Sequence, residues 1–251
     1  MTPASLSGSF GYFCVGHPSS MKKKLLIFLF ISNLSFAQSK KGFVQYGGLA
    51  GVSIVNLYGN PFIETFLKSS TRVVAGPSVY YPLSNHWAVK SNLFYESKGA
   101  GGIMPLYDKE GEPLGFFNAE IHYNYLTIPL LFDFMFGRRL KGNLSAGPFV
   151  GVLLHQRSTF TQPITDLKIE KKGTGGFYPW DGGAVFAAGL RFAVNKRVTL
   201  SFESRINFGL ANIVSQPVLG STTIYTLATQ HLLGFYYTPG YLAGKVRAGH
   251  E

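Results

Sequence analysis

The segment V-T-L-S-F-E-S-R-I-N-F-G-L at residues 198–210 sets the pattern for the rest of the chain. Every second residue from Val198 to Leu210 is apolar, except Ser204, and the residues between them are polar or Gly. Because side chains on a strand alternate between its two faces, the segment predicts a β-strand with one apolar and one polar face. At roughly 3.3 Å per residue and a tilt of about 40°, it spans on the order of 30 Å, whereas soluble strands usually stop after about 5–6 residues. The segment is therefore predicted to cross a membrane.

Seven further segments show similar alternation and are also predicted to be strands. They are residues 42–58, 72–81, 87–98, 120–136, 143–156, 181–194 and 222–237. The connections alternate between long and short, and the short ones fall at residues 82–86, 137–142 and 195–197. A sheet that spans a membrane must close, because lipid cannot hydrate an unpaired edge. We therefore predict an all-β fold, an eight-stranded antiparallel up-and-down transmembrane β-barrel with long outer loops and short periplasmic turns.

The composition agrees with a barrel and argues against a helical membrane protein. Only 14% of the 251 residues are charged, against about 25% in typical soluble domains. Gly is frequent, with 30 residues, and aromatic residues make up 15% of the chain. After the N-terminal region, no uncharged apolar run reaches the roughly 18 residues that a membrane-spanning helix needs.

Residues 21–37 have the parts of a secretory signal peptide. A basic M-K-K-K start at Met21 precedes a short apolar run, and S-F-A ends at Ala37, directly before Gln38. We therefore predict cleavage between Ala37 and Gln38 and export to the outer membrane of a Gram-negative bacterium. Because a secretory signal normally begins a protein, residues 1–20 are interpreted as a non-native extension. The barrel domain is then residues 38–237, and residues 238–251 form a C-terminal tail.

Export also limits the chemistry and the partners of the mature chain. Cys14, the only cysteine, would be removed, so neither a disulfide framework nor a thiol nucleophile is expected. The net charge of +11 could suggest a nucleic acid partner. However, the basic residues are scattered through turns and loops, and an exported chain rarely meets nucleic acid, so none is predicted.

Alternation alone does not show which face of each strand points inward. A secreted soluble ligand-binding barrel has the same period with an apolar lumen and a charged exterior. Three features favour the membrane barrel: the length of the strands, a Gly-rich polar face with charges of both signs, and aromatic residues at the ends of the apolar faces. These aromatic residues are Tyr46, Trp87, Tyr95, Phe136 and Tyr237.

Several segments resemble the PorT-like family of outer-membrane β-barrel proteins. They are G-P-S-V-Y-Y at 76–81, L-F-Y-E-S-K-G at 93–99, Y-L-T-I-P-L-L at 125–131, S-A-G-P at 145–148 and L-G-F-Y-Y at 233–237. The resemblance implies an eight-stranded outer-membrane barrel in contact with lipid and lipopolysaccharide, inserted by the barrel assembly machinery. The family name is tied to protein secretion, but no residue here carries that role over. One departure is that residues 238–251 follow Tyr237, where such barrels usually end on an aromatic residue.

Seven charged residues are predicted to project into the lumen. They are Lys90, Glu96, Lys98, Asp133, Arg191, Glu203 and Arg205. They could line a polar conduit or a binding site, or they could pair with one another and fill the barrel. Pairing is favoured, because eight strands leave room only for side chains and unpaired buried charges are costly. We therefore predict a non-enzymatic barrel whose outer loops contact a partner or support the envelope or secretion.

The alternative function is a lipid-modifying enzyme with its site at the outer rim. A His base oriented by a carboxylate could be built from Glu120, His122 and His155, with Asp166 or Asp181 from the next loop. However, the chain has no G-x-S-x-G motif. It also has no spacing typical of metal ligands and no loop framed for phosphate binding. No catalytic residue, metal or cofactor is therefore predicted.

The signal peptide gives a first testable prediction. N-terminal sequencing of the protein extracted from membranes should begin at Gln38. A mature product that contains residues 1–20 would contradict this prediction.

Overall fold

The structure is a computed structural model that describes residues 43–107, 111–138, 140–163, 168–216 and 223–239. The predicted N-terminal extension, signal peptide and cleavage site at Ala37 and Gln38, Asp166, and most of the C-terminal tail lie outside the described residues. The described chain forms ten strands and one short helix. They are β1 (Gln45–Tyr58), α2 (Pro61–Phe66), β2 (Leu67–Pro82), β3 (Trp87–Asn92), β4 (Phe94–Tyr107), β5 (Pro113–Gly137), β6 (Leu140–Thr161), β7 (Lys168–Lys172), β8 (Trp180–Ala193), β9 (Val198–Gly209) and β10 (Tyr225–Tyr237). No helix in these ranges is long and apolar enough to cross a membrane.

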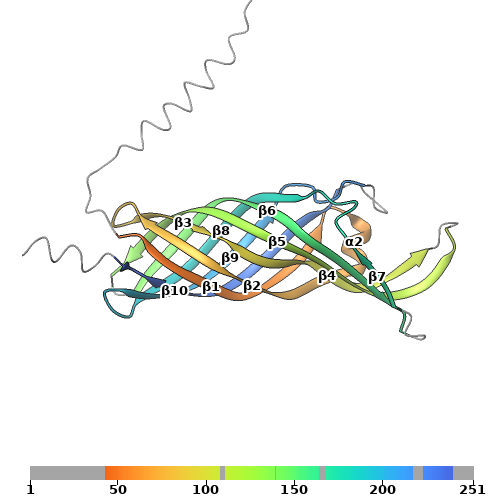
Figure 1. The fold of residues 1–251 in the computed structure, drawn as a ribbon, viewed down its shortest axis with the longest axis horizontal. Helices are drawn as coiled ribbons and strands as arrows, with labels where there is room; N and C mark the ends of the chain where they lie inside the picture. Colours follow the sequence, from red (N-terminus) through yellow and green to blue (C-terminus); the bar gives the residue numbers. More distant parts are fainter. Residues whose placement is uncertain (1–42, 108–110, 139, 164–167, 217–222, 240–251) are drawn as a thin grey trace, which may run out of the picture. The chain divides into compact units, whose positions relative to one another are not determined.

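The strands pair with their neighbours in a closed, antiparallel ring (Figure 1). The first strand, β1, pairs with β2 on one side and with the last strand, β10, on the other. The ring then runs from β10 through β9, β8 and β6 to β5. It closes because β3 and β4 both lie between β5 and β2. Among the described strands, only β7 lies outside this ring, since it pairs with the end of β6.

The structure has ten strands where the sequence predicted eight, and two local differences account for this. The predicted strand 87–98 is interrupted at Leu93 into β3 and β4, which follow one another in a single position of the ring. The Leu93 amide donates to the Pro77 carbonyl at 3.0 Å, but Pro77 has no N–H to donate in return, so the ladder is weakened there. The second difference is β7, which forms inside a predicted loop. The ring itself therefore has eight positions.

The predicted long loops are wrong in part, because the strands extend into them. Residues 99–107 continue β4 and pair with β5 in a long hairpin, which reaches past the other strands (Figure 1). The glycines in this stretch allow close pairing rather than a loop: a Cβ on Gly102 would collide with the carbonyl oxygen of Phe66. Between β1 and β2, the Asn60 side chain accepts hydrogen bonds from the Phe62 and Ile63 amides and starts α2.

The two ends of the ring therefore differ. The short-turn end carries the connections β2–β3, β5–β6 and β8–β9, at residues 83–86, 138–139 and 194–197. The long-hairpin end carries α2, the β4–β5 hairpin, the β6–β7 pair and the connection from β9 to β10.

The apolar face of the strands points outward and the charged face points inward. On β9, Leu200 and Phe202 are 47% and 45% exposed, whereas Glu203 and Arg205 are 3% and 1% exposed. Ser204, the polar exception on the outward face, shares a 3.2 Å hydrogen bond with His231 on β10. This arrangement is the reverse of a soluble barrel with an apolar lumen, so that alternative is wrong.

The exposed apolar residues form a band of the height expected for a membrane. On β5 the outward row runs from Leu126 to Phe136 without a polar residue, which corresponds to about 25 Å at the usual strand tilt. Aromatic residues lie at its edges. Trp87 and Phe136 are at the short-turn end, where Tyr46 is paired with Tyr237, and Tyr95 is paired with Leu126 at the other edge.

An apolar cluster fills the lumen at the long-hairpin end. Ile63 from α2 and Ile213 from the connection after β9 are 6% and 0% exposed and pack into it. The Ile213 amide donates to the Ile224 carbonyl at 3.0 Å, which holds this connection in place. The cluster is completed by Leu57, Leu67, Ala100, Ala119, Ile121, Tyr123, Tyr125, Leu153, Val214 and Ile224.

The outward position of Phe202 can be tested by substitution. Phe202 lies near the middle of β9, so Phe202→Arg places a charge in hydrocarbon and should lower the free energy of unfolding by about 2–4 kcal/mol. Reversible unfolding in lipid vesicles measures this effect.

The matched control is Leu140→Arg, since Leu140 is also exposed but lies at the first residue of β6, at the edge of the band. It should cost about 0–1 kcal/mol. Equal effects of the two substitutions would show that the apolar face does not contact lipid.

Candidate functional site

Among the described residues, the lumen holds eight buried charged side chains, four cations and four carboxylates. All seven residues predicted to face the lumen are found there, with exposures of 0% to 6%. The eighth is Asp181, the second residue of β8, which is 0% exposed. The cations are Lys90, Lys98, Arg191 and Arg205, and the carboxylates are Glu96, Asp133, Asp181 and Glu203.

One part of this charge network is centred on Glu203. The Lys90 ammonium and the Arg205 guanidinium both bind the Glu203 carboxylate, one to each oxygen. Lys90 Nζ also lies 3.9 Å from Asp133 Oδ1, which accepts from Asn143 at 2.8 Å. The Lys90–Glu203 pair joins β3 to β9, which are not neighbours in the ring, so this pair crosses the lumen.

A second part is centred on Lys98. Its Nζ lies 2.7 Å from Asp181 Oδ2 and 3.2 Å from Glu96 Oε1. Glu96 accepts two further hydrogen bonds, from Thr127 at 2.7 Å and from Gln230 at 2.6 Å. Because buried charges are costly unless they are paired and hydrogen-bonded, these contacts allow charged side chains to be buried in the lumen.

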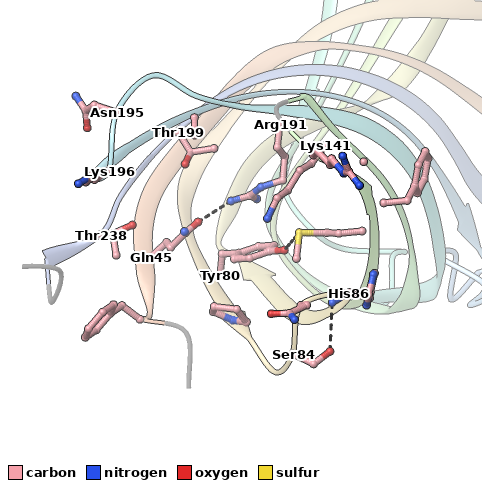
Figure 2. Close-up of a pocket in the computed structure, with 18 residues that line it drawn as sticks. Gln45, Tyr80, Ser84, His86, Lys141, Arg191, Asn195, Lys196, Thr199 and Thr238 are labelled. Atoms are coloured by element: carbon pink, nitrogen blue, oxygen red, sulfur yellow. Dashed lines mark hydrogen bonds between the residues drawn. The ribbon is translucent and has the colours of Figure 1, made fainter. Parts of the chain in front are cut away.

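A cavity opens from the lumen at the short-turn end (Figure 2). This vestibule has a volume of about 640 Å³. Its described lining includes His86, Arg138, Lys141, Arg191 and Lys196, and none of the lining residues is Asp or Glu. The vestibule is therefore electropositive, so it attracts anions and disfavours cations.

Arg191 forms the inner wall of the vestibule and is only 6% exposed. Its guanidinium donates to Gln45 at 2.6 Å (Figure 2). It also stacks on the rings of Tyr80 and Tyr236, at 3.7 and 4.5 Å from their centroids. Cation–π contacts of this kind hold a cation without neutralising its charge. Next to it, the Tyr80 hydroxyl donates to Met135 Sδ at 2.7 Å. The vestibule therefore ends on a fixed positive charge.

The residues proposed for a lipid-modifying enzyme are only partly brought together. Glu120, His122 and His155 line one cavity, and Glu120 Oε1 lies 3.3 Å from His122 Nε2. The prediction that Asp181 could join them is wrong, because its carboxylate is buried in the lumen and binds Lys98. Among the described residues, no group of His, Cys, Asp and Glu is arranged to hold a metal ion.

The sequence could have indicated Asp181 as a lumenal residue. Asp181 is in phase with Arg191 on the same strand, and Arg191 was predicted to face inward. It was assigned to the preceding loop because it is the first residue of the predicted strand 181–194. No comparable sequence pattern indicates the vestibule, because its basic residues come from turns and from the ends of several strands.

Comparison with known proteins gives a matching family model and several similar solved structures. The family model described as the outer membrane protein beta-barrel domain matches residues 36–215. Among solved structures, Neisserial surface protein A is 12% identical over 78% of this chain and 96% of its own, with a TM-score of 0.42. Ail of Yersinia pestis is 9% identical over 78% and 99% (TM-score 0.40), and OprG from Pseudomonas aeruginosa is 13% identical over 80% and 98% (TM-score 0.40). No curated protein matches. The family assignment rests on this family model alone, and membership of the PorT-like group stays a prediction.

The charge network can be tested at Glu203. Glu203→Gln removes the negative charge that Lys90 and Arg205 share, and should cost about 3–5 kcal/mol of unfolding free energy, because two buried cations lose their partner. Glu120→Gln is the matched control: its side chain is 57% exposed, so it should cost less than about 1 kcal/mol. Chemical unfolding in detergent measures both, and an equally small loss for Glu203→Gln would contradict the network.

Proposed function

We propose, from the premise that the chain belongs to the outer membrane protein beta-barrel domain family, that it is a non-enzymatic barrel that presents its long-hairpin end to the outside. In this proposal the eight positions of the ring make an eight-stranded transmembrane barrel. Its role is to display the outer hairpins to a partner or to support the envelope or secretion, rather than to conduct solutes. The proposal rests on one observation, that side chains fill the lumen.

Two layers of side chains fill the barrel between the vestibule and the long-hairpin end. The charge network occupies the middle, with its charged side chains 0–6% exposed, and the apolar cluster follows it. A narrow barrel of eight strands has an interior just wide enough for side chains. The vestibule therefore ends blindly at Arg191 and the network, which argues against a porin-like function.

The connections support the proposed orientation. Outer-membrane barrels have short periplasmic turns and longer extracellular loops. By this rule the short-turn end and its electropositive vestibule face the periplasm, and the long-hairpin end faces outward.

The β4–β5 hairpin carries an apolar patch that suits a protein partner. Ile103 and Tyr107 on β4 and Phe116 on β5 are 57%, 48% and 63% exposed. All three lie closer to the hairpin tip than Glu120. Glu120 is the first charged residue after the apolar band on the outward row of β5, so the three residues lie outside that band. Large apolar side chains grouped in water at the tip of a hairpin are typical of an interaction surface.

The orientation can be tested with single cysteines, after replacement of Cys14 if it is retained. Gly175→Cys places a thiol at an open position of the connection between β7 and β8, and Asn85→Cys places one in an exposed short turn. A membrane-impermeant maleimide added to intact cells should label position 175 and leave position 85 unlabelled until the cells are lysed. Labelling of position 85 alone in intact cells would reverse the orientation and defeat the proposal.

A further inference from the structure

Arg191 differs from the other buried cations of the lumen because no carboxylate binds it. Lys90, Lys98 and Arg205 each form an ion pair with a buried carboxylate. Among the described residues, Arg191 has no such pair, and Gln45 is the one acceptor of its hydrogen bonds. A guanidinium is always charged and carries five N–H donors. Because Arg191 lines the vestibule, its other donors can serve a ligand held there.

A second cation lies directly beside Arg191 in the sheet. Lys141 on β6 is the register partner of Arg191 on β8, and both side chains line the vestibule (Figure 2). The described lining contains no Asp or Glu that could separate them. Like charges directly opposite one another on neighbouring strands destabilise a sheet. An anion bound between the two side chains would remove this repulsion.

The charge network does not neutralise this pair. Its four cations, Arg191 included, equal its four carboxylates in number, so Lys141 is an additional positive charge. Arg138, in the basic turn G-R-R-L-K at 137–141, also lines the vestibule. The three connections of the short-turn end contain no Asp or Glu. A counter-ion for Lys141 and Arg138 is therefore expected from a ligand rather than from the described chain.

The arrangement of the two cations indicates a phosphate group. Two adjacent cations favour a group with close to two negative charges, which a phosphate monoester carries at pH 7, whereas a carboxylate carries one. A guanidinium presents a rigid fork that matches phosphate oxygens, and an ammonium adds a point charge. The rings of Tyr80 and Tyr236 hold the Arg191 fork in place before a ligand binds, which lowers the entropic cost of binding.

The vestibule has room for more than the phosphate group. Its volume of about 640 Å³ is within the range of small-molecule sites, roughly 300–1,000 Å³. Phe43, Tyr80 and Met135 add apolar surface to the lining, so an organic body attached to the phosphate can also be held. Because the vestibule ends at the charge network, a bound molecule stays at the short-turn end and does not cross the barrel.

We propose that the vestibule is a binding site for a phosphate group, either of a small phosphorylated organic molecule or of free inorganic phosphate, which Arg191 and Lys141 bind together. This inference does not depend on the orientation of the barrel in the membrane, because it concerns the short-turn end alone.

The test is isothermal titration calorimetry of the mature chain in an uncharged detergent, with glucose 6-phosphate, inorganic phosphate, glucose and acetate as probes. The titrations are made at physiological ionic strength, which screens distant charges. Both phosphates should bind about tenfold or more tightly than acetate, and glucose should not bind, because the phosphate supplies the charge-assisted contacts. Tighter binding of glucose 6-phosphate than of inorganic phosphate would assign the site to organic esters, and equal binding would assign it to free phosphate.

Lys141→Gln and Arg191→Gln should each lower the affinity for glucose 6-phosphate about tenfold or more, because each removes a charge-assisted contact. Circular dichroism verifies that each variant folds. Lys141 is only half-buried at the second residue of β6, so its variant keeps the test valid if Arg191→Gln does not fold.

The matched control is Arg197→Gln. It removes the same charge from the same end of the barrel, but Arg197 does not line the vestibule, so the affinity should change by less than about twofold. Equal affinities for phosphate and acetate, binding of glucose alone, or equal losses in Arg197→Gln and Lys141→Gln would overturn the inference.

Discussion

The burial of paired charges in the lumen is the constraint on which the rest of the structure depends. Each of the eight charged side chains is stable only if its strand keeps the register that points it inward. A shift of one residue would turn every side chain of that strand to the other face. Charges would then meet lipid, at about 2–4 kcal/mol for a Lys or Arg near the midplane. The alternation of polar and apolar residues and the pairing of the lumenal charges therefore depend on the same strand register.

The same constraint separates the two ends of the barrel. The charge network fills the middle of the lumen and separates the electropositive vestibule from the apolar cluster at the other end. The vestibule can stay open to water because Arg191 is held by Gln45 and two aromatic rings. The opposite end is closed by Ile63 and Ile213, which come from α2 and a connection rather than from the ring. Function is therefore expected at the surfaces of the barrel more than through its centre.

Much of this could be predicted from alternation alone. The segment 198–210 predicted the outward row with Phe202 and the inward pair Glu203 and Arg205, because period two is a strong signal in long strands. The features that could not be predicted depend on neighbours far away in the sequence. Gly102 was interpreted as part of a loop, but it lies in a strand because Phe66 approaches its backbone closely. The interruption at Leu93 depends on Pro77 in the adjacent strand, and β7 forms only because β6 extends beside it.

The central claim is that the lumen is filled from the vestibule to the long-hairpin end. The most direct measurement is the electrical conductance of the mature barrel in a planar lipid bilayer, with insertion verified by protection from protease. No steady ohmic conductance is expected at moderate voltage, because ions entering the vestibule stop at Arg191 and the charge network. A steady conductance that scales with salt concentration would show a continuous water-filled path through the barrel, and the lumen would then not be filled.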